Sequence, residues 1–321
     1  MNPLFEYFQH NHALAKIEYA IMTKSSCLTL EDFDLEMLPE SVLKCEHLGE
    51  LLLAHNKLQS VSLQINSLKN LHTLAIDYNN LDRFPNELKE LTQLKFLNIS
   101  HNPIKDLTEH IGCLTNLEHL WCNACCLSAI PNAIGNLEHL DTFGARNNFI
   151  SQISPGVCKL VKLRWLTLDN NKLTSVPAAF ENLQSLIHLN LAHNHFNSIP
   201  YTLCKLKKLR YLLFQSNELF SINESVLLKM KQLYKINLMN NPISSNKETL
   251  TKFNNILLPG ANFEAPSQDV ESDSDSESTS TDWEDSIGSS EIDFGRSEEA
   301  SDDEDAPVDV LPKLSKYLLT Y

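Results

Sequence analysis

Residues 163–173 read LRWLTLDNNKL, with leucine at the first, fourth, sixth and eleventh positions and asparagine at the ninth. This pattern starts again every 23 residues through most of the 321-residue chain. Self-similarity at a period of roughly 20–50 residues is typical of stacked units that pack on their neighbours. The units begin at Leu48, Leu71, Leu94, Leu117, Leu140, Leu163, Leu186 and Leu209, and Leu233 follows one residue late.

A single unit has too little apolar surface to fold alone. Its order is a short strand, a turn, a loop marked by proline and a returning segment. Ordering the backbone of one residue costs roughly 1–2 kcal/mol, whereas burying one leucine contributes about 1.5–3 kcal/mol, so neighbouring units must cover both sides of each apolar layer. The sequence therefore predicts an α/β solenoid of the leucine-rich repeat type. We expect it to be curved, with a parallel β-sheet on the concave face and short helical or irregular segments on the convex face.

The ends of the repeat region can also be located. Counting back one period from Leu48 places a degenerate first unit at Ser25, so about ten units are expected between residues 25 and 245. The two ends of a solenoid need capping segments that cover the exposed apolar layer. Residues 246–263 are expected to form the C-terminal cap. Residues 1–24 are expected to form an N-terminal capping helix, because one helical face carries Ala13, Leu14, Ile17, Ala20 and Ile21.

The acidity of the chain is concentrated after the repeats. The net charge is −15, but residues 264–309 hold 18 acidic residues and one base, Arg296, which gives that segment −17 and the rest of the chain +2. Because it has so little apolar surface, we expect this segment to be disordered. Residues 310–321 form a separate short hydrophobic motif.

Hydroxyl side chains of the acidic segment are followed by an acid three residues later, which resembles the substrate pattern of casein-kinase-2-type kinases. Each phosphate would add about −1.5 to −2 of charge; the alternative is a segment that only aids solubility. The predicted phosphorylation sites are Ser272, Ser274, Thr279, Thr281, Ser290 and Ser301. Either an external basic protein or a basic edge of the solenoid fits this segment. The edge would contain Lys159, Lys162, Arg164, Lys205, Lys207, Lys208 and Arg210.

The sequence also predicts where in the cell the protein is located and whether its cysteines are reduced. No run of about 18 apolar residues exists, and the N-terminus has His, Lys and Glu where a signal peptide needs an apolar core. We therefore expect a cytoplasmic protein, with the nucleus as the alternative, and reduced cysteines. The repeat register places Cys122 in the core and Cys125 at the asparagine position, so this C-x-x-C pair predicts a structural role and no metal site.

Proline follows an apolar residue after several turns, at Leu38-Pro39, Phe84-Pro85, Ile130-Pro131, Val176-Pro177 and Ile199-Pro200. With the period of 23 residues, this signature resembles the short-type intracellular leucine-rich repeat proteins that include Ras-suppressor and Shoc-2-like scaffolds. The resemblance covers about residues 25–243 and departs from the pattern at Pro155 and in the acidic segment. It implies partner proteins bound on the concave face.

The positions between the strand leucines point toward the concave solvent, and several hold large aromatic residues. We expect a protein-binding patch there, because exposed aromatic clusters with few charges are typical of interface cores. The alternative is that the rings stack on one another and only cover the sheet. Gly144 is expected to leave a dimple between two tryptophans, and Arg146 to pair with Asp169. The predicted partner-binding residues are Phe96, His119, Trp121, Gly144, Arg146, Trp165, His188 and Tyr211.

The sequence lacks the residue patterns of a catalytic site. No Ser/His/Asp or Cys/His group and no phosphate-binding glycine loop is found, and the asparagine row is expected to satisfy backbone groups. We therefore expect a monomeric, non-enzymatic signalling scaffold that binds a partner protein and uses no cofactor, nucleic acid or membrane. Two alternatives remain: a substrate-recognition subunit of a ubiquitin ligase, and an acidic-tailed chaperone of basic nuclear proteins.

Overall fold

A computed structural model describes residues 3–245 of the chain. The chain divides into two units, Met1–Pro266 and Ser267–Tyr321, and the described residues all belong to the first. The cap expected at 246–263, the acidic segment at 264–309 and the hydrophobic motif at 310–321 lie outside the described residues. The six predicted phosphorylation sites also lie there.

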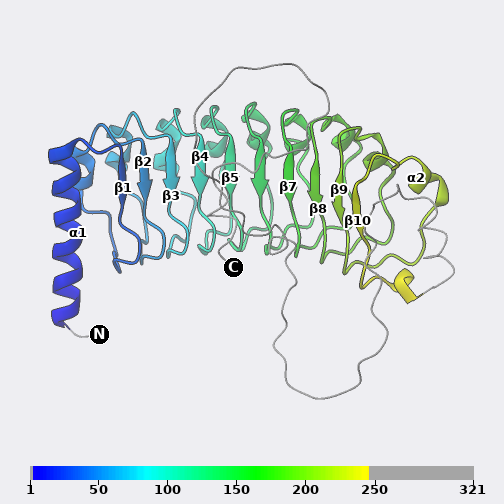
Figure 1. The fold of residues 1–321 in the computed structure, drawn as a ribbon, viewed down its shortest axis with the longest axis horizontal. Helices are drawn as coiled ribbons and strands as arrows, with labels where there is room; N and C mark the ends of the chain where they lie inside the picture. Colours follow the sequence, from blue (N-terminus) through cyan, green and yellow to red (C-terminus); the bar gives the residue numbers. More distant parts are fainter. Residues whose placement is uncertain (1–2, 246–321) are drawn as a thin grey trace, which may run out of the picture. The chain divides into compact units, whose positions relative to one another are not determined.

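Ten short strands form one parallel sheet, in which each strand pairs with the next one along the chain (Figure 1). The middle residue of each strand pairs with the middle residue of the next, as Leu166 does with Leu189. This register is the one that the 23-residue period predicts. The strands are β1 (Cys27–Thr29), β2 (Glu50–Leu52), β3 (Thr73–Ala75), β4 (Phe96–Asn98), β5 (His119–Trp121), β6 (Thr142–Gly144), β7 (Trp165–Thr167), β8 (His188–Asn190), β9 (Tyr211–Leu213) and β10 (Lys235–Asn237).

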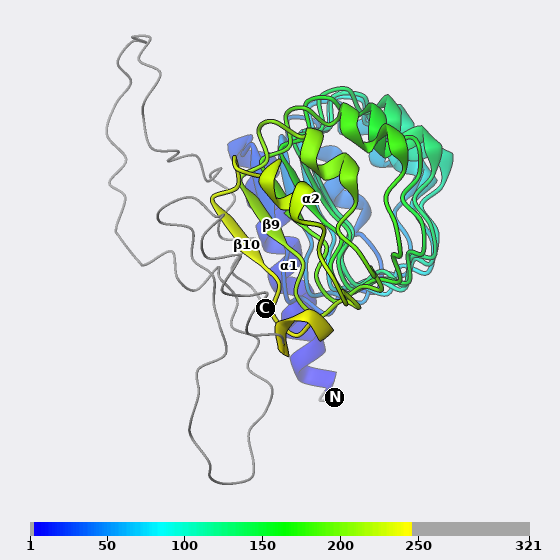
Figure 2. The same cartoon turned by 90° about the vertical axis from the view of Figure 1, so that its right-hand side faces the viewer.

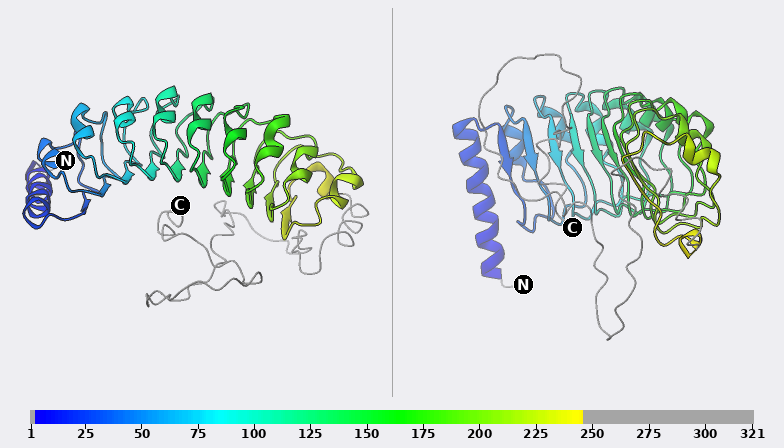
Figure 3. Two further views of the ribbon diagram at one scale, coloured as in Figure 1. Left: turned by 90° about the horizontal axis from the view of Figure 1, so that it is seen from above. Right: turned by 45° about the vertical axis from the view of Figure 1, so that its right-hand side comes forward.

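Short helices return the chain on the other side of the sheet. Proline stands just before five of them, where its fixed φ suits a helix start and its missing N–H costs nothing. In Figure 3 the strands line the inner side of an arc and the helices its outer side, and Figure 2 looks along the stack. The curved repeat solenoid is thus confirmed. The helices are η1 (Glu40–Lys44), η2 (Leu63–Ser67), η3 (Asn86–Glu90), η4 (Glu109–Cys113), η5 (Asn132–Asn136), η6 (Val157–Lys159), η7 (Ala178–Asn182), η8 (Tyr201–Lys205), η9 (Pro242–Ser245) and α2 (Glu224–Leu228).

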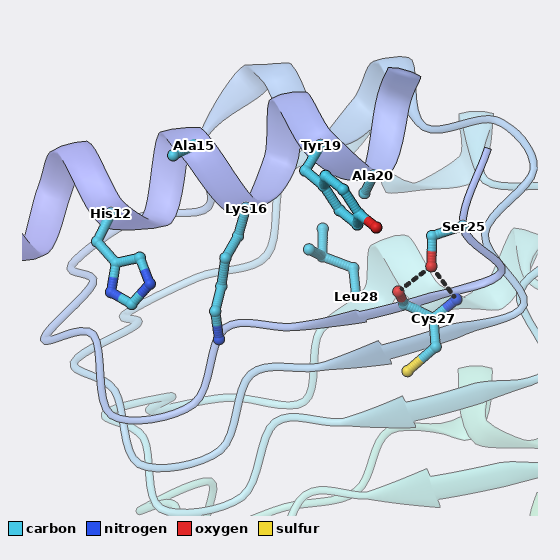
Figure 4. Close-up of a pocket in the computed structure, with 8 residues that line it drawn as sticks. All are labelled: His12, Ala15, Lys16, Tyr19, Ala20, Ser25, Cys27 and Leu28. Carbon is cyan, nitrogen blue, oxygen red and sulfur yellow. Dashed lines mark hydrogen bonds between the residues drawn. The ribbon is translucent and has the colours of Figure 1, made fainter. Parts of the chain in front are cut away.

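Helix α1 (Pro3–Thr23) covers the N-terminal end of the apolar layer. Ala13 and Ile17 are fully buried against the first repeat. The edge strand β1 is also protected, because Lys16 Nζ donates to the carbonyl of Thr29 at 3.2 Å and Ser25 Oγ bonds the backbone of Cys27 (Figure 4). Side-chain partners of this kind occupy an edge that could otherwise pair with another chain.

A ladder of eight asparagines closes the turns after β2 to β4 and β6 to β10. Asn171 is representative: its Nδ2 donates to the carbonyls of Ala145, Leu168 and Asp169 at 3.0–3.2 Å, and its Oδ1 accepts from the backbone N–H of Ile150. The buried amide therefore satisfies backbone groups that water cannot reach, as predicted. The same pattern holds at Asn56, Asn79, Asn102, Asn148, Asn194, Asn217 and Asn241.

Cys125 interrupts this ladder. Its Sγ lies 3.2 Å from the carbonyl oxygen of Ile99 and 3.4 Å from that of Asn123, so the thiol takes over part of the donor role. A thiol supplies no amide oxygen, however, and the backbone N–H of Ile104 bonds to the Asn102 carbonyl instead. Lys105, the next residue, has φ 68°, the left-handed region that is strained for side chains other than glycine.

Candidate protein-binding face

Six ring-bearing residues on strands β4 to β9 form the centre of the concave side, and we call them the aromatic face. Their side chains come from the strand positions that alternate with the buried leucines, so the backbone alone places them on one side of the sheet. Adjacent strands lie about 4.8 Å apart, which is close enough for rings on neighbouring strands to touch. The aromatic face consists of Phe96, His119, Trp121, Trp165, His188 and Tyr211.

The rings are not equally open to solvent. Tyr211 is 39% exposed, and Trp121, Trp165 and His119 are half-buried. Phe96 and His188 are only 3% and 2% exposed, so the expectation that all of these residues stand in solvent is wrong for these two. At His188 the reason is contact between neighbouring strands, because its imidazole is stacked on the indole of Trp165. The stacking alternative therefore holds at His188, whereas the ring of Phe96 meets that of His119 at 6.4 Å with an interplanar angle of 51°.

His188 packs against Trp165 and supports its ring. Its imidazole stacks on the indole of Trp165 with 4.6 Å between ring centroids and an interplanar angle of 16°, and it meets Tyr211 at 6.3 Å. Burial lowers the pKa of His188 to about 3, so the ring is neutral near pH 7. The indole of Trp165 therefore packs on a neutral ring that is itself buried.

Gly144 supports the second tryptophan in a different way. It pairs with Trp121 across β5 and β6, and a Cβ atom added to it would lie 2.3 Å from Trp121 Cε3 and 2.6 Å from Cζ3. The indole therefore lies over the glycine. The expected dimple for a partner's side chain is a wrong prediction, since Trp121 itself fills that space. Glycine is needed here because the two groups approach so closely.

Polar and charged side chains lie beside the aromatic face. The backbone N–H of Arg146 donates to Asn123 Oδ1 at 3.1 Å, and the predicted pairing of its side chain with Asp169 stays a prediction. Burial lowers the pKa of His119, although nearby Asp141 and Glu118 raise it. Asp141 is itself held by the guanidinium of Arg164, whose Nη2 lies 3.0 Å from Asp141 Oδ2.

A second group of rings, which the sequence reading missed, lies at the turns after β2, β3 and β4. Tyr78 is stacked between His55 and His101, at centroid distances of 4.3 and 4.0 Å and angles of 10° and 7°. All three residues have positive φ. His55, Tyr78 and His101 occupy the eighth position of three consecutive units, so a comparison of that position along the sequence could have found the group. Next to Tyr78, burial raises the pKa of Asp77 to about 6.

The C-x-x-C cysteines have the structural positions that the register predicts. Both are fully buried, and Cys122 Sγ lies 3.2 Å from the carbonyl oxygen of Gly144. Burial raises the pKa of Cys125 to about 12 and that of Cys122 well above its ordinary value, so both remain thiols. Within residues 3–245, no three His, Cys, Asp or Glu side chains are grouped as a metal ion requires. No helix in this range is long and apolar enough to cross a bilayer.

Comparison with known families identifies the repeats. The family model described as "Leucine rich repeat" matches residues 46–104, 136–196 and 161–219. A second model, described as "Leucine Rich repeats (2 copies)", matches residues 92–136. No curated protein sequence gives a significant match to the chain.

Several solved structures share the fold at low sequence identity. The functional domain of InlJ from Listeria monocytogenes has a TM-score of 0.58 at 22% identity, over 68% of this chain and 46% of that one. The internalin InlF from the same organism has 0.55 at 20% identity, over 71% and 81%. The ectodomain of the Arabidopsis thaliana receptor kinase GASSHO1/SCHENGEN3 has 0.52 at 24% identity, over 64% of this chain and 31% of that one. The chain therefore spans less than half of the InlJ domain and of the plant ectodomain.

Four observations identify the same kind of repeat. They are the repeat period, the ten-stranded parallel sheet, the asparagine ladder and the family matches. Domains of this kind are generally protein-interaction modules, and they are typically non-enzymatic. The chain is a leucine-rich repeat protein.

Proposed function

We propose that this protein is a non-enzymatic scaffold that binds a partner protein on its aromatic face. The observation that carries the proposal is the support beneath the two tryptophans: Trp121 lies over Gly144, and Trp165 is stacked on His188. Side chains that are already held in one orientation lose little rotamer freedom on binding, so more of their contact energy is available as affinity. Tryptophan and tyrosine are also enriched among the residues that dominate binding energy.

The geometry of the aromatic face supports a macromolecular partner. Trp121 and Trp165 lie on β5 and β7, strands that are two steps or about 10 Å apart, and Tyr211 lies on β9, two strands further on. This span suits several side chains of a protein surface. The GASSHO1/SCHENGEN3 ectodomain, which shares the fold, was solved in complex with Casparian strip integrity factor 2. We further propose that the protein acts as a monomer in cytoplasmic signalling.

Quantitative affinity capture with the full chain as bait tests the proposal. Trp165→Ala and Trp121→Ala each remove one anchor, and Phe149→Ala is the matched control because Phe149 is 52% exposed and lies beyond the asparagine turn, outside every strand. Proteins that bind the aromatic face should be captured by the wild-type and Phe149→Ala chains. Their recovery should fall at least about thirtyfold with either tryptophan variant, a change of roughly 2 kcal/mol.

Equal recovery with all four baits would contradict the proposal. Capture of a cullin adaptor with unchanged efficiency in both tryptophan variants would instead favour a ubiquitin-ligase subunit. Basic nuclear proteins that are lost on removal of residues 264–309, but not on removal of either indole, would favour the acidic-tailed chaperone.

A further inference from the structure

The two halves of the described solenoid carry net charges of opposite sign. Residues 3–154 carry 18 acidic and 10 basic residues, which gives −8, whereas residues 155–245 carry 4 acidic and 11 basic residues, which gives +7. The repeat pattern itself does not require this division, because the charged residues occupy the variable positions of the units. The division therefore makes the last repeats attractive to a negatively charged partner.

The bases of the positive half are concentrated around the start of the strands. Lys162 and Lys208 precede the first leucine of their repeats, Arg164 and Arg210 follow it, and Lys207 and Lys231 lie two residues before it. Parallel pairing in constant register places equivalent positions along one line. This line runs along the edge where the 3-10 helices lie, the upper edge in Figure 1. We call the six residues the basic rim.

Local contacts hold the arginines of the rim in place. The Arg164 guanidinium is paired with the Asp141 carboxylate. Arg210 differs, because its Nη1 donates to the backbone carbonyls of Lys207, Leu209 and Gln232 at 3.1–3.3 Å. Carbonyl oxygens orient a guanidinium without cancelling its full charge, so these contacts leave Arg210 a positioned cation. Lys207, Lys208 and Lys231 are exposed beside it.

Aromatic side chains border the rim on the concave side. Tyr211 is 39% exposed and Tyr234 is 63% exposed, and their rings lie 6.3 Å apart. Tyr211 directly follows Arg210 in the chain. A partner on this edge therefore meets cations and apolar rings together, which suits a peptide with both carboxylates and apolar residues better than it suits a small ion.

We propose that the basic rim is the docking site for an acidic segment of a partner protein. Lys162 and Lys208 are both exposed and lie two strand steps, about 10 Å, apart, with the uncharged Ser185 at the equivalent position between them. An extended chain rises about 3.3 Å per residue, so carboxylates three residues apart match this spacing. A long nucleic acid fits less well, because it would extend over the half of the solenoid that carries −8.

Fluorescence anisotropy with the full chain and a labelled peptide of repeating Glu-Gly-Gly units tests the proposal. The matching Gln-Gly-Gly peptide is the uncharged probe. The rim variant Lys207→Glu/Lys208→Glu/Lys231→Glu is compared with Lys44→Glu/Lys69→Glu/Lys89→Glu, which changes the net charge equally at exposed positions of the negative half. Residues 264–309 are present in every protein compared, and circular dichroism checks that each variant folds.

The wild-type chain should bind the glutamate peptide and not the glutamine peptide, and added salt should weaken the complex. The rim variant should lose at least about tenfold in affinity, whereas the control variant and Trp121→Ala should change less than about twofold. Retained binding by Trp121→Ala would show that the rim acts independently of the aromatic face. Equal losses in the rim and control variants, or no preference over the glutamine peptide, would overturn the proposal. Tighter binding of a single-stranded oligonucleotide that the rim variant abolishes would also overturn it, and would assign the rim to nucleic acid.

Discussion

The buried side and the concave side of the ten strands differ in how much their residue types vary from repeat to repeat. On the buried side, one residue type recurs in repeat after repeat, and Leu120, Leu166, Leu189 and Leu212 are all fully buried. On the concave side the residues change from strand to strand, and Gly144, Thr167 and Asn190 occupy equivalent positions. Stacking forces the buried side to be uniform because each layer packs on nearly identical layers. The concave side is free of that constraint, so its individual residues can serve recognition.

The largest effect should come from the uniform side. Leu166→Ala removes a fully buried side chain at the middle of the stack and should lower the free energy of unfolding by about 2–5 kcal/mol. Thr167→Ala, one residue later on the concave side, should change it by less than about 1 kcal/mol. Urea denaturation of both variants measures the difference, and similar losses in the two would remove the distinction between the sides.

Because His188 on the concave side is buried, the free energy of unfolding should depend on pH. Its folded pKa of about 3 is below the ordinary value of 6.5, so protonation favours unfolding and stability should fall as the pH drops below about 6.5. The linked loss at pH 5 should be about 2 kcal/mol. His188→Phe keeps a ring against Trp165 and should remove this part of the pH dependence. Identical pH profiles for wild type and variant would show that His188 titrates normally.

The Gly144 site tests the close approach of Trp121. Gly144→Ala should displace the indole and destabilise the fold by about 1–3 kcal/mol, the usual cost of overpacking. The double variant Gly144→Ala/Trp121→Ala should recover most of that loss, because the overlapping ring is gone. A double-mutant cycle with strictly additive effects would mean that the two residues do not touch.

The smallest effect should be at Cys125. Cys125→Asn restores the amide found in the other turns and offers an acceptor to the N–H of Ile104, so it should stabilise the chain by about 0.5–1.5 kcal/mol. Thermal unfolding under reducing conditions measures the shift. A clear decrease in stability would indicate that the strained turn at Lys105 cannot relax.

The sequence was sufficient for the fold because the leucine period sets strand order, register and the buried face together. It also placed Trp165 and Tyr211 in one row of the concave side and Trp121 in the adjacent row. The sequence did not predict how exposed each ring is to solvent. The exposure of Phe96 and His188 depends on the size and tilt of the rings on neighbouring strands. The space over Gly144 was misjudged for the same reason, because an indole can lie across an adjacent glycine.

The central claim is that the aromatic face binds a partner while the buried side carries the stability. The most direct measurement is therefore made on one variant, Trp165→Ala, with the partner that the wild-type chain captures. The affinity should fall by at least about 2 kcal/mol, while the free energy of unfolding should fall by only about 0.5–1.5 kcal/mol, the value of one ring stack on His188. A loss of about 3–5 kcal/mol in stability with unchanged affinity would contradict the account, since Trp165 would then act as a core residue.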